Sequence, residues 1–233
     1  MIYKKIVVPS NHRLFFIGDI HGRFDMLMKA IQHLNITSED TIVSVGDLID
    51  RGPYSRECLD FFLEHDNCHF VIGNHEDLMI NRDIYMETWL ANGGEQTQEQ
   101  LGADVQYYCD RILEKAPIIL EVEHNDKTFG VVHAGIPLSV KDMFWNDIIK
   151  QATLDEDFLE SLIWDRECIG AVLDSRRVFV NDVYGIDYVI HGHTPIPQPI
   201  LEKNRIWIDT LYAADALTLV FMENGSWQFA TVR

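Results

Sequence analysis

One unit occurs three times in the N-terminal part of this sequence: a short apolar run, a polar loop and an amphipathic segment. The apolar runs cover residues 14–17, 41–45 and 69–72, and the amphipathic segments cover residues 24–34, 55–65 and 76–89. Continuous short apolar runs are typical of strands buried in a parallel sheet, and apolar residues at helical spacing are typical of helices packed on it. Three consecutive strand–helix units predict right-handed crossover connections and an α/β fold.

Each loop carries polar residues directly after its strand, at spacings of 47 − 19 = 28 and 74 − 47 = 27 residues. The carboxyl ends of parallel strands meet at one edge of a sheet, where α/β proteins bind ligands. Carboxylate, imidazole and amide donors suit Mn²⁺, Fe or Zn²⁺ better than the oxygen cage of Ca²⁺ or the thiolates of structural zinc. We therefore expect a dinuclear metal site. The three motifs are Gly18-Asp19-Ile20-His21-Gly22, Gly46-Asp47-Leu48-Ile49-Asp50-Arg51-Gly52 and Gly73-Asn74-His75-Glu76.

The rest of the chain predicts a second layer. Strand-like runs cover residues 118–123, 128–132, 188–190, 205–208, 216–222 and 226–232, and two of them lead into His133 and His193. These runs predict a second, mixed or antiparallel sheet packed on the first. Residues 92–94 interrupt the helical pattern, a helix is expected over 103–115, and we interpret this region as a cap over the site. Residues 137–184 are the least regular, with a helix expected over 155–163, and are interpreted as an insertion that faces the substrate.

Composition excludes several classes of protein. The formal net charge of −18 argues against binding to nucleic-acid backbones, which depends on Lys and Arg. No apolar run approaches a membrane span or a signal-peptide core. Because Cys58, Cys68, Cys109 and Cys168 contain no Cys-x-x-Cys pair, we expect reduced, buried thiols. The expectation is a cytoplasmic protein that binds neither nucleic acid nor membrane; the sequence indicates no oligomeric state.

The motifs Asp-x-His, Asp-x-x-Asp-Arg-Gly and Asn-His-Glu, in this order, resemble those of the phosphoprotein phosphatase (PPP) family of metallophosphoesterases. The bacterial and phage type, which includes the phage lambda protein phosphatase, is the most similar. The resemblance extends from residue 14 to about residue 222 and is weakest between residues 97 and 160. It implies a calcineurin-like metallophosphoesterase fold, with two packed mixed β-sheets flanked by helices, and one domain over residues 1–233.

The resemblance also implies the metal ligands. Asp19 and His21 would hold one divalent ion, Asn74, His133 and His193 a second, and Asp47 would bridge both. We expect Mn²⁺, with Fe or Zn²⁺ as alternatives. A carboxylate between two ions about 3.5–4 Å apart is the arrangement of two-metal hydrolysis, in which bound water is a nucleophile at neutral pH.

Four further residues would act on the phosphate ester. The resemblance makes His75 the general acid that protonates the leaving group, oriented by Asp50. Arg51 and Arg166 would grip phosphate oxygens, because a guanidinium fits a tetrahedral oxyanion bidentately. The alternatives are a loop-capping carboxylate for Asp50 and a surface ion pair with a neighbouring acid for Arg166. His191 is interpreted as a core residue or one that supports a ligand.

The resemblance implies hydrolysis of phosphoserine and phosphothreonine in proteins, and some microbial members also accept phosphotyrosine. One alternative is a diadenosine tetraphosphatase, whose second motif usually lacks the counterpart of Asp50. Another is a non-catalytic scaffold of the same fold, which the intact ligand set and His75 argue against. Two positions depart from the family pattern: Ile72 stands where many members carry arginine, and Leu211 follows Asp209-Thr210 in place of glycine.

Overall fold

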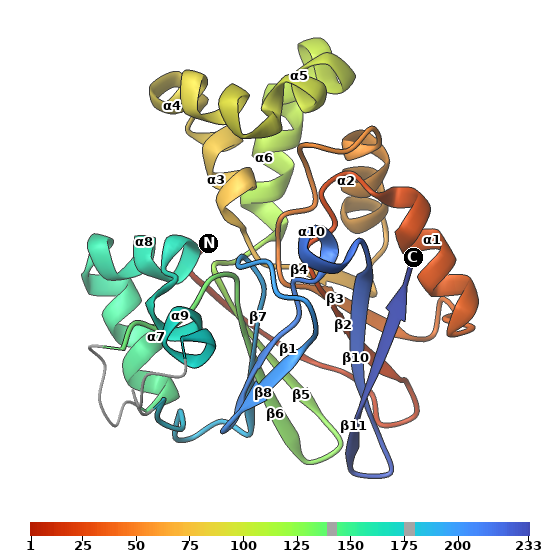
Figure 1. Cartoon of the computed structure of the whole chain (residues 1–233), viewed down its shortest axis with the longest axis vertical. Helices are drawn as coiled ribbons and strands as arrows, with labels where there is room; N and C mark the ends of the chain where they lie inside the picture. Colours follow the sequence, from red (N-terminus) through yellow and green to blue (C-terminus); the bar gives the residue numbers. More distant parts are fainter. Residues whose placement is uncertain (139–143, 175–179) are drawn as a thin grey trace.

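The strands form two sheets that lie face to face, with helices on both outer sides, in a computed structural model that describes residues 1–138, 144–174 and 180–233 (Figure 1). The five-stranded sheet has the order β11-β10-β2-β3-β4, and the six-stranded sheet has the order β1-β5-β6-β7-β9-β8. Both contain parallel and antiparallel neighbours. The expected pair of packed mixed sheets is therefore confirmed.

The five-stranded sheet contains the three strands of the repeated unit, which run parallel to one another. All four residues of β2 and of β3 are buried, as continuous apolar runs require. On the far side of β2, β10 runs antiparallel and pairs with β11. The strands are β2 Leu14–Ile17, β3 Thr41–Ser44, β4 Cys68–Phe70, β10 Leu217–Glu223 and β11 Ser226–Val232.

In the six-stranded sheet, β6 and β7 run parallel, so their carboxyl ends lie beside each other. The sequence did not predict β1, a short edge strand in which Lys4 and Lys5 interrupt the apolar residues. Lysine is common on edge strands because it discourages pairing with other chains. The strands are β1 Tyr3–Val7, β5 Ile119–His124, β6 Lys127–Val132, β7 Tyr188–His191, β8 Ile200–Glu202 and β9 Arg205–Trp207.

The core lies in three layers. Between the sheets, Phe16 and Val43 of one sheet belong to the same buried cluster as Val131 and Ile190 of the other. A second cluster joins the outer face of the five-stranded sheet to helices α1, α2, α3 and α6, and a third joins the six-stranded sheet to α7 and α8. Each fully buried large apolar side chain contributes about 1.5–3 kcal/mol. The helices are α1 Phe24–His33, α2 Ser55–Glu64, α3 Asn74–Ile80, α4 Arg82–Trp89, α5 Glu95–Leu101, α6 Val105–Lys115, α7 Trp145–Leu154, α8 Glu156–Trp164, α9 Glu167–Leu173 and α10 Leu211–Ala214.

The helix expected over residues 76–89 is divided into two. Asn81, with φ −94° and ψ 23°, ends α3 and begins α4. The interruption expected at residues 92–94 is confirmed at Gly93, whose backbone is not helical and which lies in η1 Leu90–Gly94, a π-helical turn that connects α4 to α5. Gly93 makes this possible because it has φ 102°. A short 3₁₀ turn, η2 Gly102–Asp104, then leads into α6.

Residues 137–184 are more regular than the sequence indicated. Three helices, α7, α8 and α9, lie there, although only the middle one was expected. Asp155 accepts a hydrogen bond from Phe158 N and caps α8, which explains why this helix was recognisable. Residues 139–143 and 175–179 of the expected substrate-facing segment lie outside the described residues.

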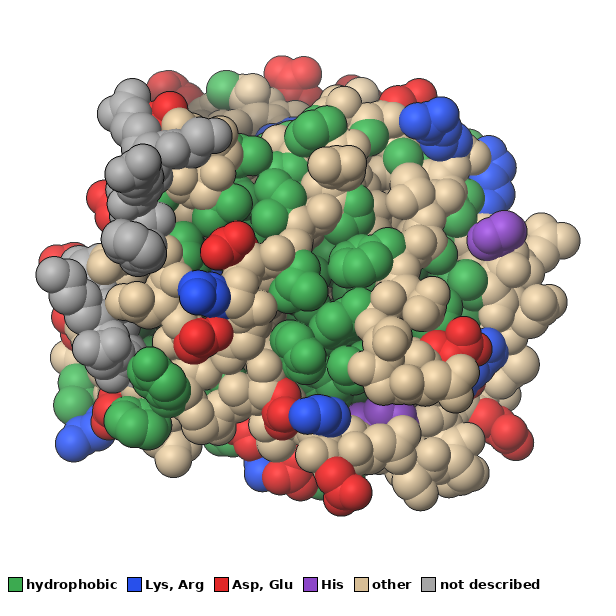
Figure 2. Space-filling view, turned by 60° about the horizontal axis from the view of Figure 1, so that its bottom comes forward, with side chains coloured by type: hydrophobic (Ala, Val, Ile, Leu, Met, Phe, Trp, Pro, Cys, Tyr) green, Lys and Arg blue, Asp and Glu red, His purple; other side chains and the backbone are tan. Residues whose placement is uncertain are grey.

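Figure 2 looks onto the end of the molecule that carries the β10–β11 hairpin, where apolar side chains gather at the surface and charged side chains surround them. The intersheet core ends in partly buried apolar residues, among them Tyr188, Met222 and Trp227. None of the described helices is long and apolar enough to cross a membrane. The four cysteines are buried and form no disulfide, as expected.

Candidate metal centre

The loops after β2 and β3 are joined by backbone hydrogen bonds, and the loop after β4 is joined to the second loop through the side chains of Asp47 and Glu76. The amides of Ile20 and His21 both donate to the carbonyl of Asp47, at 3.0 and 2.8 Å. Gly73 lies so close to the second loop that a Cβ atom there would collide with the side chain of Asp47. The glycine therefore allows the third loop to approach the second, and the three motifs meet at one sheet edge as the sequence predicted.

Two groups of buried side chains converge at this edge, and Asp47 belongs to both. His21, Asp47 and His75 form the first, and Asp47, His133 and His193 form the second; within each group the donor atoms lie within 4.8 Å of one another. One Asp47 oxygen lies 3.6 Å from His21 Nε2 and the other lies 3.4 Å from His133 Nε2. Asp47 therefore lies between the two groups, as a bridging carboxylate must.

Asn74 and Asp19 complete the arrangement. Asn74 Oδ1 lies 3.0 Å from His133 Nε2 and 2.8 Å from His193 Nδ1. The Asp19 carboxylate is buried and accepts a hydrogen bond from the backbone amide of His193 at 3.0 Å. The structure thus brings all six expected ligand residues to one site, although Asp19 belongs to neither three-residue group.

The three imidazoles are oriented by backbone carbonyls. His21 Nδ1 lies 3.0 Å from Ile49 O, and His133 Nδ1 lies 2.7 Å from Val45 O. His193 Nε2 lies 3.1 Å from Trp164 O. A carbonyl can only accept, so these nitrogens carry the protons and the opposite nitrogens present lone pairs to the centre. This is how proteins hold histidine ligands.

The result is a set of acceptors that face one another. Asn74 Oδ1 is surrounded by the lone-pair nitrogens of His133 and His193, and Asp47 Oδ1 lies beside them. In addition, Asp209 Oδ1 is buried with no hydrogen-bond partner among the described residues. Buried acceptors without donors are costly unless a cation lies between them. The donor set, O and N without sulfur, fits divalent metal ions of intermediate hardness.

Electrostatics support the same conclusion. Burial and the neighbouring Asp47 raise the pKa of Glu76 to about 7 and that of Asp209 to about 6. Burial and Asp209 likewise raise the pKa of Asp19 well above its ordinary value. For His133, burial opposes protonation, but the charge of Asp47 outweighs it and raises the pKa to about 10, so without a cation beside Asp47 a proton takes its place on Nε2. The site therefore favours positive charge at its centre.

Glu76 and Asp209 are two site residues to which the sequence assigned no role. The Glu76 carboxylate accepts hydrogen bonds from the amides of Asp47, Leu48 and Gly73, so it holds the second loop on the third. Its place in the Asn-His-Glu motif was a signal of this function. Asp209 follows β9, and its only signal was its position after a strand.

His75 and Asp50 form a buried pair. His75 Nδ1 lies 2.7 Å from Asp50 Oδ2, so Nε2 faces the metal centre, 4.0 Å from Asp47 Oδ2. Asp50 does not cap its loop as the alternative required: its side chain accepts from His75 and from Trp89 Nε1. The pair can deliver a proton from the second imidazole nitrogen to a group bound at the centre.

The two arginines lie on either side of the centre. Arg51 directs Nη1 at His21 Nε2 and Nη2 at His75 Nε2, at 3.0 and 2.9 Å. Its guanidinium stacks on the Tyr212 ring at 5.0 Å. Arg166 donates to Thr194 Oγ1 at 3.2 Å, beside His193, and no ion pair joins it to either neighbouring acid. The surface ion pair considered for Arg166 is therefore not formed.

Two other expectations concern residues around the site. His191 is fully buried, with Nδ1 3.0 Å from Val132 O and its ring stacked on Trp207, so it belongs to the core. Ile72, in the position where many family members have arginine, packs in the core beneath α3. Neither residue belongs to the two groups of candidate metal ligands.

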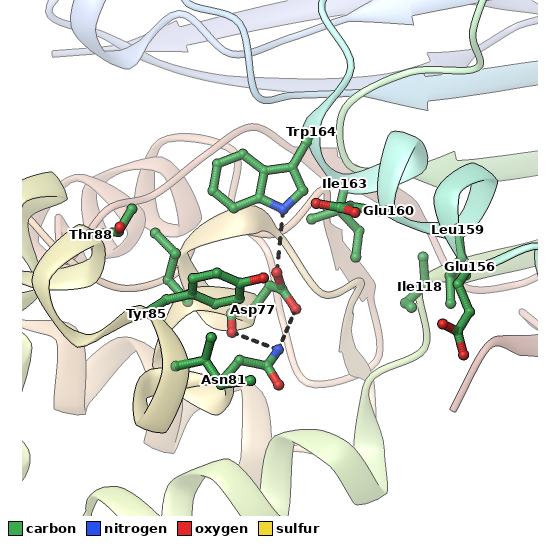
Figure 3. Close-up of a pocket in the computed structure, with 12 residues that line it drawn as sticks. Asp77, Asn81, Tyr85, Thr88, Ile118, Glu156, Leu159, Glu160, Ile163 and Trp164 are labelled. Carbon is green, nitrogen blue, oxygen red and sulfur yellow. Dashed lines mark hydrogen bonds between the residues drawn. The ribbon is translucent and has the colours of Figure 1, made fainter.

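A cavity of about 500 Å³ lies next to the centre, between α3–α4 and α8 (Figure 3). Trp164 separates the two: its indole donates to Asp77 Oδ2 at 3.3 Å and its carbonyl holds His193. The lining is apolar with three carboxylates, from Asp77, Glu156 and Glu160. Figure 3 shows Asp77 and Tyr85 on one wall and Leu159 and Glu160 on the other. Such a surface suits an apolar segment that carries positive charge.

Two packed mixed sheets with buried Asp, His and Asn donors at one edge, and arginines beside them, define a metal-dependent phosphoesterase. The chain belongs to the calcineurin-like phosphoesterase family, whose model matches residues 12–197. Enzymes of this family use divalent metal ions, and the chain is a phosphatase enzyme of this class.

Relatives and solved structures agree with this assignment. The serine/threonine-protein phosphatase 1 of Salmonella typhimurium is 32% identical over 90% of this chain and 91% of its own. The bis(5'-nucleosyl)-tetraphosphatase PrpE of Anoxybacillus flavithermus is 27% identical over 83% of each chain. A serine/threonine phosphatase structure from Saccharomyces cerevisiae, similar to human PP5, superimposes with a TM-score of 0.66 at 16% identity and covers all of this chain and 83% of its own. That likeness shows the fold.

Proposed function

We propose that this chain is a serine/threonine protein phosphatase that hydrolyses phosphomonoesters in phosphorylated proteins or peptides. The observation that carries the proposal is the buried His75–Asp50 pair, 2.7 Å apart, whose second imidazole nitrogen lies 2.9 Å from Arg51 Nη2. A serine or threonine alkoxide is a poor leaving group, and a proton donor next to a phosphate-binding arginine is what its departure requires. The 32% identical phosphatase relative supports the same substrate class.

For the metals, we propose that Asp19, His21 and Asp47 hold one divalent ion and that Asp47, Asn74, His133 and His193 hold the other. The donors suit Mn²⁺, with Fe or Zn²⁺ as alternatives. When bound, the pair of ions would supply Lewis acidity and a water activated at neutral pH. The protein fixes the donors by the three backbone carbonyls that hold the imidazoles and by Glu76, which fixes the backbone of Asp47.

For the ester, we propose that Arg51 and Arg166 hold the non-bridging phosphate oxygens from two sides. Neither guanidinium has a carboxylate partner among the described residues; Arg51 points at ring nitrogens of His21 and His75, and Arg166 points at Thr194, so both lie where an anion at the centre would meet them. His75 Nε2 would give its proton to the leaving oxygen, while Asp50 keeps Nδ1 protonated and the ring in one orientation. Charge-assisted hydrogen bonds of this kind contribute about 1.5–3 kcal/mol each.

The neighbouring cavity supports a protein substrate. A phosphatase that acts on proteins needs a surface for the residues around the phosphorylated side chain. The cavity of Figure 3 provides one, since only Trp164 lies between it and the metal centre. We propose one domain over residues 1–233. We also propose a cytoplasmic location, which the four unpaired cysteines support because disulfides are rare in reducing compartments.

The experiment compares two substrates in wild type and His75→Asn. Hydrolysis of a phosphoserine peptide should lose about 10²- to 10⁴-fold in kcat, the usual contribution of general acid catalysis. Hydrolysis of p-nitrophenyl phosphate should lose much less, since nitrophenolate leaves without protonation. Metal content, measured on the same samples, should be unchanged. An equal loss on both substrates would show that His75 acts on phosphate binding or on the metal centre and not on the leaving group.

A second candidate is hydrolysis of diadenosine tetraphosphate, favoured by the tetraphosphatase relative at 27% identity. The two functions differ in leaving group, since a nucleotide phosphate departs without a proton donor. The wild-type enzyme, assayed with Mn²⁺ on a phosphoserine peptide, a phosphotyrosine peptide and diadenosine tetraphosphate, separates them. A kcat/KM at least about tenfold higher on the dinucleotide than on either peptide would overturn the protein phosphatase proposal.

A further inference from the structure

The loop that carries the acid pair and the phosphate-binding arginine has an unusual backbone. Asp50 and Arg51 have φ values of 72° and 67°, a region that L-residues other than asparagine, aspartate and histidine rarely occupy, so Arg51 is the more unusual of the two. Such a conformation persists only where the surrounding residues hold it. Here the surroundings are residues 89–97, which include η1 and the start of α5.

Trp89 holds the Asp50 carboxylate. The indole is fully buried, and its Nε1 donates to both oxygens, at 3.2 and 3.0 Å. From the same region, Thr97 Oγ1 accepts a hydrogen bond from Asp50 N at 3.0 Å. Since His75 Nδ1 bonds to Asp50 Oδ2, the carboxylate lies between the indole and the imidazole and cannot rotate away from either.

Gly93 holds Arg51. Its carbonyl accepts a hydrogen bond from Arg51 N at 3.1 Å, and the carbonyl of Asn92 accepts one from Arg51 Nε at 3.3 Å. A Cβ atom on Gly93 would lie 2.6 Å from Arg51 Cγ and 3.0 Å from Arg51 N. Only glycine leaves room for the arginine in this position. The Tyr212 ring lies against the guanidinium at 5.0 Å.

From these contacts we infer that residues 89–97 position the two chemical groups separately. Trp89 positions the proton donor His75 through Asp50, and Gly93 positions the phosphate-binding guanidinium of Arg51. The inference rests on the roles of His75 and Arg51 in the proposed function. Neither Trp89 nor Gly93 touches the substrate; both act through the loop of Asp50 and Arg51. Replacing Trp89 and replacing Gly93 should therefore change the kinetics in different ways.

Trp89→Phe tests the first half. The ring is kept and the donor to Asp50 is lost, so the imidazole should lose its fixed orientation. We expect kcat on phenyl phosphate, which needs a proton donor, to fall about ten- to a hundredfold, and kcat on p-nitrophenyl phosphate to fall less than about threefold. Metal content should not change. If this variant does not fold, Thr97→Val removes a second hydrogen bond to Asp50 from the same region and should shift the same ratio.

Gly93→Ala tests the second half. The methyl group should displace Arg51, so the inhibition constant of inorganic phosphate should rise about tenfold or more. The value of kcat/KM should fall by the same factor on phenyl and p-nitrophenyl phosphate, because the proton donor is intact. A loss confined to phenyl phosphate, or unchanged inhibition by phosphate, would contradict the assignment of Gly93.

Matched controls distinguish positioning from stability. Trp227→Phe removes an indole N–H that has no partner among the described residues, far from the loop, and should leave the ratio of the two rates unchanged. Gly102→Ala replaces another glycine of positive φ, at 54°, where a Cβ atom meets nothing within 4 Å. It should lower thermal stability without altering phosphate inhibition.

The outcomes separate this inference from the proposed function. Wild-type enzyme that hydrolyses aryl phosphates but no phosphopeptide would overturn the substrate proposal. The roles of Trp89 and Gly93 would still be tested on the aryl phosphates. An equal loss for Trp89→Phe on both aryl phosphates would overturn the role of Trp89 while the substrate proposal stands. No metal-dependent hydrolysis of either aryl phosphate by the wild type would overturn both.

Discussion

His21, His133 and His193 each use one ring nitrogen on a backbone carbonyl and present the other to the metal centre. At the scale of single residues, this division decides what the site can bind. A carbonyl partner selects the tautomer, and the tautomer decides that a lone pair, not a proton, faces the centre. Asp47 Oδ1 accepts a hydrogen bond from the amide of His75, but Asp47 Oδ2 and Asn74 Oδ1 face the lone pairs of the imidazoles, and a cation satisfies them together.

Asp47→Asn should abolish metal binding and activity together, because the amide removes the negative charge shared by both halves of the centre. Elemental analysis of the purified variant gives metal per chain, and circular dichroism shows whether the fold is kept. The matched control is Asp60→Asn on α2, away from the centre. Two metals per chain with normal turnover would exclude Asp47 as the bridging ligand.

Arg166→Ala should lower kcat/KM on a phosphoserine peptide about ten- to a hundredfold and leave metal content unchanged. The loss corresponds to one or two charge-assisted hydrogen bonds to phosphate oxygens. Arg111→Ala, which removes a half-buried guanidinium stacked on Tyr107, serves as the control. If both variants have wild-type kinetics, Arg166 does not contact the substrate.

At the scale of secondary structure, the connections from each helix to the next strand keep the repeated units in place. The connection from α1 to β3 is an example: the Asp40 carboxylate accepts hydrogen bonds from Arg13 at 2.9 and 2.6 Å and from the amide of Thr37 at 2.7 Å. Burial opposes ionisation of this carboxyl, but Arg13 and the Thr37 amide lower its pKa to about 2. The ionised carboxylate therefore stabilises the connection.

Asp40→Asn should lower the melting temperature at pH 7, and the difference from wild type should disappear in acid. The folded-state pKa is about 2 and the unfolded value is about 3.9, so the stabilisation is present above pH about 4 and is lost as the pH falls toward about 2. Thermal melts of both proteins at pH 7, 4 and 2.5 measure it. Glu39→Gln, an exposed neighbour, is the control; a difference at pH 2.5 as large as that at pH 7 would contradict the assignment.

At the scale of the whole molecule, the fold places negative charge where cations neutralise it. The chain carries a net charge of −18, and Asp19, Asp47, Glu76 and Asp209 are buried around one centre. Burial of four carboxyls in one place is unfavourable for the folded state on its own. Divalent ions that bind the folded chain and not the unfolded chain therefore stabilise it.

Removal of metals with EDTA should lower the melting temperature by roughly 5–10 °C relative to protein in excess Mn²⁺. Ligand at a hundred times its dissociation constant adds about 2.7 kcal/mol, and each kcal/mol shifts the melting temperature about 2–4 °C for a chain of this size. Differential scanning calorimetry measures the shift. Asp47→Asn should show little response to EDTA, and an equal response in both proteins would assign the stabilisation to metal bound elsewhere.

The sequence by itself determined the three motif loops and the sheet edge at which they meet. Polar residues directly after an apolar strand are a local pattern, and parallel strands place such residues together whatever the rest of the chain does. The strand-end histidines, His133 and His193, were recognised in the same way. The edge strand β1 and helices α7 and α9 were missed because their patterns are short or irregular.

Only the tertiary structure decided what surrounds those loops. Trp89 meets Asp50 across 39 positions, a contact that depends on the end of α3 at Asn81, which the helical pattern did not predict. Asp209 joins the centre because β9 belongs to the second sheet, and the packing of the two sheets aligns its end with that of β2. Contacts between distant elements depend on how buried faces fit together, and that fit is a property of the folded chain as a whole.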